Sequence, residues 1–195
     1  MKINHPIKGR IEYQPYPYQQ ELIDLMKSGQ NVIVKSSRQM GLSTTMFAAI
    51  REMCLETPNH KALVVTSSGY GQDGLNRFPD DSEVKCRSKH RIEFNNGSAI
   101  EFVPGTKVEH QTHKDHDVYY DLYEFISEKS KTNIEREVGD DNVRFYSFTG
   151  NNDFNRNGFI PLKWNWDLHP DRDQEWLNLQ YQLLGDKTVN REILL

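Results

Sequence analysis

The chain has 195 residues, a length within the usual range for a single domain. Hydrophobic residues make up 36% of it and aromatic residues 11%, which is enough to build a core and argues against intrinsic disorder. The formal net charge of −4 excludes a generally basic nucleic-acid-binding protein, so any contact with DNA would need a local basic patch.

Cysteine content and hydropathy further limit the class of protein that the sequence can encode. Cys54 and Cys86 are the only cysteines, too few for a disulfide framework or a four-cysteine zinc site, and they fit a reducing environment. The sequence contains no apolar run of 18 residues and no signal-peptide pattern. We therefore expect a soluble protein that is not exported.

Residues 1–15 show little pattern and are expected to form an N-terminal arm, with 16–195 as one domain. A helix is expected to begin at Pro17, because proline favours the first helical turn. Its apolar side would consist of Leu22, Ile23, Leu25 and Met26.

The stretch from Val32 to Thr45 organises the rest of the chain. Val32 to Val34 predict a short buried strand, a small polar loop closes on Gly41, and Thr44 to Glu56 has the apolar spacing of a helix. A strand, a loop with glycine and a helix that opens on hydroxyl residues form the frame of a phosphate-binding P-loop.

The standard spelling of that loop, G-x-x-x-x-G-K-S/T, is not met. Ser36 stands at the first glycine and Leu42 at the lysine, whereas Ser43 keeps the hydroxyl position that would hold magnesium. A lysine at the start of the loop, Lys35, is long enough to reach back to a phosphate. The alternative is a solvated Lys35 at a strand end beside an ordinary turn.

The middle of the chain predicts a strand at 61–66, which with the preceding strand and helix suggests a parallel β-α-β unit. Residues 67–87 are polar and glycine-rich and predict a loop or insert. Residues 91–94 and 99–103 alternate around an Asn-Gly turn, which predicts a hairpin.

Three histidines follow, His110, His113 and His116. On one helix face this spacing would suit a metal ion, but no fourth ligand is evident, and a solvated loop is the favoured interpretation.

Strands and helices alternate again in the rest of the chain. We expect a strand at 118–121 that ends in Asp121, a helix at 127–138, a strand at 143–149, an aromatic strand at 159–166 and a helix that begins near His169 and ends at Gly185. Ser127 is the expected N-cap of the first helix.

Several of these motifs resemble the large terminase subunit of tailed bacteriophages, the ATP-driven motor that packages DNA. Ser37-Arg38-Gln39-Met40-Gly41 followed by Ser43-Thr44 is similar to that family's P-loop. The Asn-Gly hairpin, the strand ending in Asp121 and the closing tryptophan strand and helix follow in the family's order. The resemblance covers about residues 16–195 and implies an ASCE-type P-loop NTPase fold: a largely parallel sheet flanked by helices, plus a β-hairpin.

The resemblance also implies a site for ATP and Mg²⁺. Gln19 would bond the adenine base with Tyr18 nearby, although a short core helix with a polar glutamine is the alternative. The phosphates would lie over the loop. The implied nucleotide-binding residues are Tyr18, Gln19, Ser36, Ser37, Gln39, Met40, Gly41, Leu42, Ser43 and Thr44.

Magnesium would be held by Ser43 and, through water, by Asp121. Lys35 and Arg38 would neutralise charge on the γ-phosphate. The family places its catalytic glutamate directly after the aspartate, but here Leu122 stands there and the nearest glutamate is Glu124. Two residues along an extended chain are roughly 6–7 Å, too far for a base unless the chain turns at once.

Thr149 and Asn151 are the implied coupling residues, although a strand end with a Gly-Asn turn explains them equally well. Implied partners are double-stranded DNA and the phage portal or small terminase subunit, with a ring oligomer on the portal in the host cytoplasm. The sequence ends before the family's nuclease domain, so no nuclease activity is expected.

Two alternatives stay open. Leu42, Leu122 and the missing nuclease favour a catalytically impaired nucleotide-binding relative with an interaction or decoy role in phage assembly. A helicase-type ATPase outside packaging would be expected to show a second recA-like half, which is not visible.

Overall fold

The computed structural model describes residues 2–5, 9–66, 82–105, 114–150 and 153–195. Within these residues, one eight-stranded sheet has the strand order β10-β3-β9-β8-β4-β7-β6-β5. Its strands are β3 (Val32–Ser36), β4 (Lys61–Thr66), β5 (Val84–Arg87), β6 (Arg91–Phe94), β7 (Ala99–Pro104), β8 (Asp117–Asp121), β9 (Val143–Thr149) and β10 (Ile160–Trp164). The sheet confirms the predicted α/β fold class.

Parallel pairing joins the strands from β10 to β7. β6 and β5 are added in antiparallel pairs, and the predicted Asn-Gly hairpin connects β6 to β7. β3 and β4 are parallel, as expected of a β-α-β unit, but β9 and β8 lie between them.

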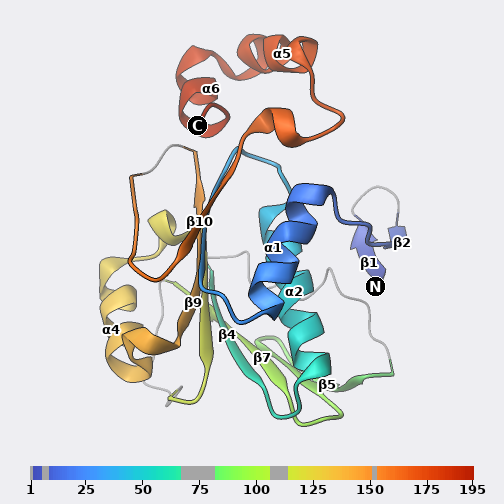
Figure 1. The fold of residues 1–195 in the computed structure, drawn as a ribbon, viewed down its shortest axis with the longest axis vertical. Coiled ribbons are helices and arrows are strands. Elements are labelled where there is room, and N and C mark those ends of the chain that lie inside the picture. The colour runs from blue at the N-terminus through green and yellow to red at the C-terminus, as the bar shows by residue number, and fades with distance from the viewer. Residues whose placement is uncertain (1, 6–8, 67–81, 106–113, 151–152) are drawn as a thin grey trace.

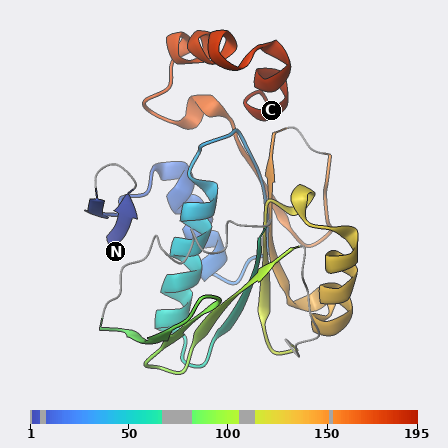
Figure 2. The ribbon, with the colours of Figure 1, turned by 180° about the vertical axis from the view of Figure 1, so that it is seen from behind.

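Helices cover both faces of the sheet (Figure 1). α1 (Pro17–Lys27) and α2 (Leu42–Glu56) lie on one face and α4 (Glu128–Val138) on the other, as the view from behind also shows (Figure 2). Successive side chains of β3 point to opposite faces. Val32 and Val34 therefore enter the core beneath α1 and α2, and Ile33 enters the core beneath α4.

The C-terminal part of the chain lies beyond the carboxyl ends of the parallel strands, at the top of Figure 1. It consists of η3 (Trp166–Leu168), α5 (Gln174–Leu184) and α6 (Asp186–Glu192). The predicted helix begins at Gln174 rather than near His169, because the Asp173 carboxylate accepts the Trp176 N–H and caps it. It ends before Gly185, as predicted.

Two short 3₁₀ turns, η1 (Tyr123–Phe125) and η2 (Asp140–Asn142), flank α4. α4 itself begins as predicted, since the Ser127 hydroxyl accepts the Ser130 N–H. None of the helices in the described ranges is long and apolar enough to cross a membrane.

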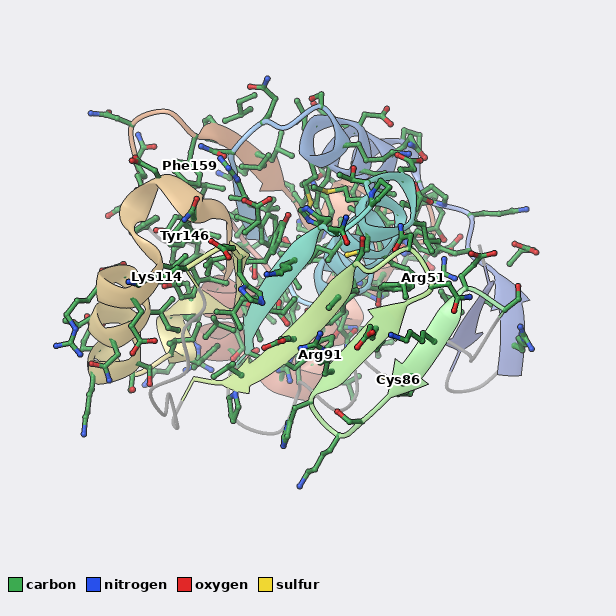
Figure 3. The ribbon with its side chains drawn as sticks, turned by 90° about the horizontal axis from the view of Figure 1, so that it is seen from below. Arg51, Cys86, Arg91, Lys114, Tyr146 and Phe159 are labelled. Carbon is green, nitrogen blue, oxygen red and sulfur yellow. The ribbon has the colours of Figure 1, made fainter. Side chains whose placement is uncertain are left out.

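Two segments expected to be irregular contain strands. β1 (Lys2–His5) and β2 (Gly9–Glu12) pair antiparallel within the predicted arm. The predicted loop or insert at 67–87 was wrong for its last four residues, which form the edge strand β5 by pairing with β6. Figure 3 shows this edge, with Cys86 and Arg91 labelled. Residues 67–81 lie outside the described part.

The favoured solvated-loop interpretation was wrong for His116. This side chain is 8% exposed directly before β8, and its Nε2 lies 3.8 Å from the Glu101 carboxylate. His110 and His113 lie outside the described residues, so the alternative of a metal site at the three histidines, which the sequence disfavours, is not tested.

Candidate functional site

The loop between β3 and α2, residues 37–41, turns tightly at the carboxyl end of the sheet. Gln39 has a φ of 63° and Gly41 a φ of 79°, both in the left-handed region. Glycine adopts this region freely, whereas for a non-glycine residue it costs about 1 kcal/mol or more. α2 follows at once, and its first turn contains no acidic residue. Helix N-termini present unpaired N–H groups, so this loop and helix can receive an anion.

A hydroxyl and a carboxylate meet beside this helix start. The Ser43 hydroxyl donates to Asp121 Oδ1 at 2.9 Å, although the two residues are 78 positions apart. Ser147 Oγ donates to the same oxygen at 3.2 Å and accepts the Leu122 N–H at 2.7 Å. Asp121 is 2% exposed. Carboxylate and hydroxyl oxygens are suitable direct or water-mediated ligands for Mg²⁺, so the donor set fits this ion.

The chain turns immediately after Asp121. Leu122 has a φ of 57°, and η1 follows it. This turn brings Glu124 back to the sheet, where its Oε1 accepts the Thr149 N–H at 2.8 Å. Among the described residues, Glu124 Oε2 is buried without a hydrogen-bond partner. Burial raises the pKa of this carboxyl above its ordinary value. The turn that a displaced glutamate requires is therefore present.

Leu42 occupies the position of the usual P-loop lysine, and Lys35 is the lysine at the start of the loop. The two side chains differ in their surroundings. Lys35 is half-buried in β3, and alternation puts it on the sheet face of Ile33, opposite to α2. Leu42 is 8% exposed and belongs to the core that contains Met46. Leu42 is thus a packing residue, and the role of Lys35 at the phosphates stays a prediction.

The C-terminal segment contacts the start of the loop. Glu192 accepts the Arg38 N–H through its backbone carbonyl at 2.8 Å and pairs with the Arg38 guanidinium through Oε2 at 2.6 Å. Ser37 Oγ donates to the Ile193 carbonyl at 2.5 Å. Gly150 is required beneath this segment, because a Cβ there would overlap the Arg191 carbonyl oxygen. Arg38, a predicted catalytic cation, is therefore engaged by Glu192.

Tyr18 and Gln19 hold the other end of the loop. Tyr18 Oη and Gln19 Nε2 donate to the Met40 carbonyl at 3.2 and 3.0 Å, and Gln19 Oε1 accepts the Tyr16 N–H at 3.0 Å. Gln19 also packs so closely on Gly41 that a Cβ there would lie 2.7 Å from Nε2. Both ends of the Gln19 amide are thus used within the protein, and adenine recognition by this residue stays a prediction.

The remaining predicted residues fall around the same edge. Ser36 ends β3, and its carbonyl accepts the Gly150 N–H at 2.9 Å. Thr44 lies in the first turn of α2. Asn151 lies outside the described residues, so only Thr149 of the two coupling residues can be placed.

Sequence reasoning missed three residues that shape the site: Ser147, Arg172 and Glu192. Ser147 could have been found, because a small hydroxyl interrupts the aromatic strand β9 two positions before Thr149. Arg172 lies in the closing stretch that resembles the terminase family, but neither Arg172 nor Glu192 carries a local signal for its contacts to the loop, which span more than 130 positions.

Comparison with known proteins gives matches among solved structures. No family model and no curated protein matches the sequence. The large terminase from a thermophilic bacteriophage, in crystal form 2, matches with a TM-score of 0.69 at 12% identity, covering 93% of this chain and 53% of that chain. Complexes of the same large terminase with ATP-γ-S and with ADP, in crystal form 3, match with TM-scores of 0.67 and 0.66 at 11% and 10% identity, each covering 92% of this chain and 52% of that chain.

The chain therefore has the α/β fold of the matched large terminase, and it spans about half the length of the terminase chains that it matches. At such identities the similarity establishes the fold alone. The chemistry has to be argued from the residues at the carboxyl edge of the sheet.

Proposed function

We propose that this chain is a nucleotide-binding domain of terminase type that hydrolyses ATP in viral DNA packaging. The observation that carries the proposal is the 2.9 Å contact between Ser43 Oγ and Asp121 Oδ1. It joins the first turn of the helix after the loop to the acidic end of β8, at the edge where α/β sheets bind ligands. The matched terminase fold, seen elsewhere with ATP-γ-S and with ADP, supports the same assignment.

In this proposal the β3–α2 loop and the first turn of α2 receive the phosphates, and Ser43 and Asp121 hold Mg²⁺ directly or through water. Bound Mg²⁺ would neutralise charge that develops on the transferred phosphoryl group. Lys35 and Arg38 supply further positive charge, with Arg38 leaving Glu192 to do so. Tyr18 and Gln19 support the loop from α1.

Glu124 is the proposed base that orients the attacking water. Its Oε2 is the atom available for this role, because Oε1 is occupied by the Thr149 N–H. The same bond would let Thr149 sense the state of Glu124. The left-handed Leu122 makes this geometry possible by reversing the chain directly after Asp121.

The second candidate is a nucleotide-binding relative with little or no turnover. The burial of Leu42 in the core favours it, since a lysine cannot simply replace that residue without burying a charge. Such a chain would bind nucleotide through the same loop and act by interaction in phage assembly.

Partners follow from the proposed class. Double-stranded DNA, the portal and the small terminase subunit would be contacted in the host cytoplasm, with the chain in a ring on the portal. Because the net charge is −4, binding of the isolated chain to duplex DNA is expected to be weak and strongly dependent on salt.

Titration calorimetry with Mg-ADP and Mg-ATP-γ-S, with and without chelator, tests the proposal. We expect saturable binding that Ser43→Ala weakens more in magnesium than in chelator. Lys129→Ala, at an exposed position of α4, is the matched control and should bind like wild type. Phosphate release from ATP then separates the two candidates. Absence of nucleotide binding in the wild-type protein would overturn both.

A further inference from the structure

Arg172 contacts the β3–α2 loop from the C-terminal part of the chain. Its Nη1 donates to the Arg38 carbonyl at 3.1 Å and its Nη2 to the Gln39 carbonyl at 2.8 Å. Nη1 also lies 3.2 Å from the sulfur of Met40. Both terminal nitrogens of the guanidinium are therefore directed at three successive loop residues, although Arg172 follows them by more than 130 positions.

The guanidinium is held in place on its other side. It stacks on the Trp176 ring, with Cζ 4.4 Å from the ring centroid. Trp176 is itself fixed by the cap of α5, where Asp173 accepts its N–H at 2.8 Å. Arg172 is half-buried, and its N–H donates to the His169 carbonyl at 3.0 Å. These contacts leave the side chain little freedom to reorient.

The orientation of the loop carbonyls determines how the contact with Arg172 affects the loop N–H groups. In a trans peptide the carbonyl of one residue and the N–H of the next point in opposite directions. Fixing the Arg38 and Gln39 carbonyls on Arg172 therefore turns the N–H groups of Gln39 and Met40 away from it. The Met40 carbonyl, held by Tyr18 and Gln19, orients the Gly41 N–H in the same way.

We propose that Arg172 is a positioning residue that holds the β3–α2 loop in the shape that binds the phosphates of a nucleotide. The inference rests on the proposed function for the ligand, but not for the effect on the loop itself. Arg172 compensates for the left-handed Gln39, whose strained backbone would otherwise relax. It acts through the loop carbonyls and not as a charge on the phosphates.

Arginine is required by this geometry. Its planar fork reaches two neighbouring carbonyls while its face stacks on an aromatic ring. Lysine keeps the positive charge but offers one nitrogen and no flat face. Arg172→Lys therefore separates positioning from simple electrostatics, because only an electrostatic role would be rescued by it.

The experiment compares Arg172→Ala and Arg172→Lys with wild type and with Arg136→Ala, an exposed arginine on α4. The first measurement is amide hydrogen exchange of ligand-free protein. We expect faster exchange in peptides that cover 37–44 for both Arg172 variants, with unchanged exchange in α4. Unchanged exchange at 37–44 would overturn the proposal whether or not the protein binds nucleotide.

The second measurement is calorimetric affinity for Mg-ADP and Mg-ATP-γ-S. Both Arg172 variants should bind each nucleotide about tenfold more weakly, since hydrogen bonds from a charged group are lost. Rescue by lysine, or a loss confined to Mg-ATP-γ-S, would assign Arg172 to direct charge stabilisation instead. A lower unfolding temperature with unchanged affinity would make it a structural residue only. Failure of wild type to bind would overturn the proposed function, and the exchange data would still decide the role of Arg172.

Discussion

The two ends of β8 carry the same residue type in opposite circumstances. At the start of the strand, Asp117 Oδ1 accepts Arg144 Nε at 2.7 Å, and Oδ2 lies 3.8 Å from His60 Nδ1. At its end, Asp121 Oδ1 accepts the hydroxyls of Ser43 and Ser147. One strand thus joins an ion-pair cluster at the amino edge of the sheet to a hydroxyl-lined carboxylate at the carboxyl edge.

The difference separates a carboxylate that is paired within the protein, Asp117, from the one that we propose to hold Mg²⁺, Asp121. Pairing with a guanidinium satisfies Asp117 within the protein and stabilises the fold. The hydroxyl contacts of Asp121 are of the kind that coordination of a divalent cation can replace, because hydroxyl and carboxylate oxygens can both serve such an ion. Substitutions at the two ends should therefore separate stability from activity.

The largest expected effect is that of Asp121→Asn. The amide keeps the shape but loses the charge that would hold magnesium, so ATP hydrolysis should fall below detection. Asp117→Asn should keep turnover and lower the free energy of unfolding by about 1–2 kcal/mol, through the weakened bond to Arg144. Steady-state phosphate release and chemical unfolding of both variants check this. Equal loss of turnover in the two would remove the distinction between the ends of β8.

How far the sequence predicts this arrangement depends on the range of the contacts. The strands from β3 to β10 other than β5, the hairpin, α4 and the Ser127 cap follow from local periodicity and turn chemistry, and these were confirmed. The proximity of Ser43 and Asp121 was predicted by resemblance and is present. The edge strand β5 was missed because pairing with β6 creates it, and its own residues show no alternating burial.

The contacts of the C-terminal segment lay outside sequence reasoning for a related reason. α6 is short, and its single buried residue, Val189, packs in a small separate core. The sequence of α6 therefore shows no periodic apolar pattern that would predict the helix. The bonds of Glu192 and Arg172 to the loop depend on how that core sits on the sheet. Such contacts are determined by tertiary packing and not by local sequence preference.

The next largest expected effect is that of Glu124→Gln, at the carboxyl edge of the sheet. Glutamine can still accept the Thr149 N–H but cannot act as a base, so turnover should fall about 10²–10⁴-fold. We expect slow turnover in the wild type, because Leu122 stands where the family has its glutamate, and Leu122→Glu should raise the rate by placing a carboxylate directly after Asp121. Phosphate release from the three proteins tests this. Brisk wild-type turnover that survives Glu124→Gln would place the base elsewhere.

The pH dependence of turnover follows from the same residue. Burial raises the pKa of Glu124, so the basic form is lost as pH falls through a value above the ordinary 4.5. The acid limb of the rate profile should therefore lie above pH 4.5 and disappear in Glu124→Gln. Stability should show the linked effect: the wild type loses stability as pH rises through that raised pKa, and the variant does not.

Lys35→Ala and Leu42→Ala form the third test, with a smaller expected effect on binding. Removing the Lys35 amine should weaken Mg-ATP-γ-S affinity about tenfold if it meets the phosphates. Leu42→Ala leaves a cavity beside Met46 and should cost about 2–4 kcal/mol of stability, with the affinity of the folded protein nearly unchanged. Calorimetric titration and unfolding curves separate the two outcomes. Equal affinities would exclude Lys35 as the phosphate-binding amine.

Glu192→Gln should have the smallest effect, because the pair that it breaks is partly exposed. The Arg38 side chain is 54% exposed, and such pairs contribute about 0–1 kcal/mol. The Arg38 N–H still donates to the Glu192 carbonyl, so the segment stays in place and only the side-chain charge changes. Freed from Glu192, Arg38 should increase affinity for Mg-ATP-γ-S a few-fold (about 2–5-fold) and leave Mg-ADP nearly unchanged.

The matched control for this substitution is Glu175→Gln, an exposed glutamate on α5. Calorimetry at low and high salt decides the outcome, since screening should remove a difference that depends on exposed charges. The Arg191 and Arg38 guanidiniums lower the pKa of Glu192, so the pair persists as pH falls below the usual glutamate range. Wild type should therefore approach the variant's affinity only in more acidic solution. An equal gain for Mg-ADP and Mg-ATP-γ-S would mean that Arg38 does not act on the terminal phosphate.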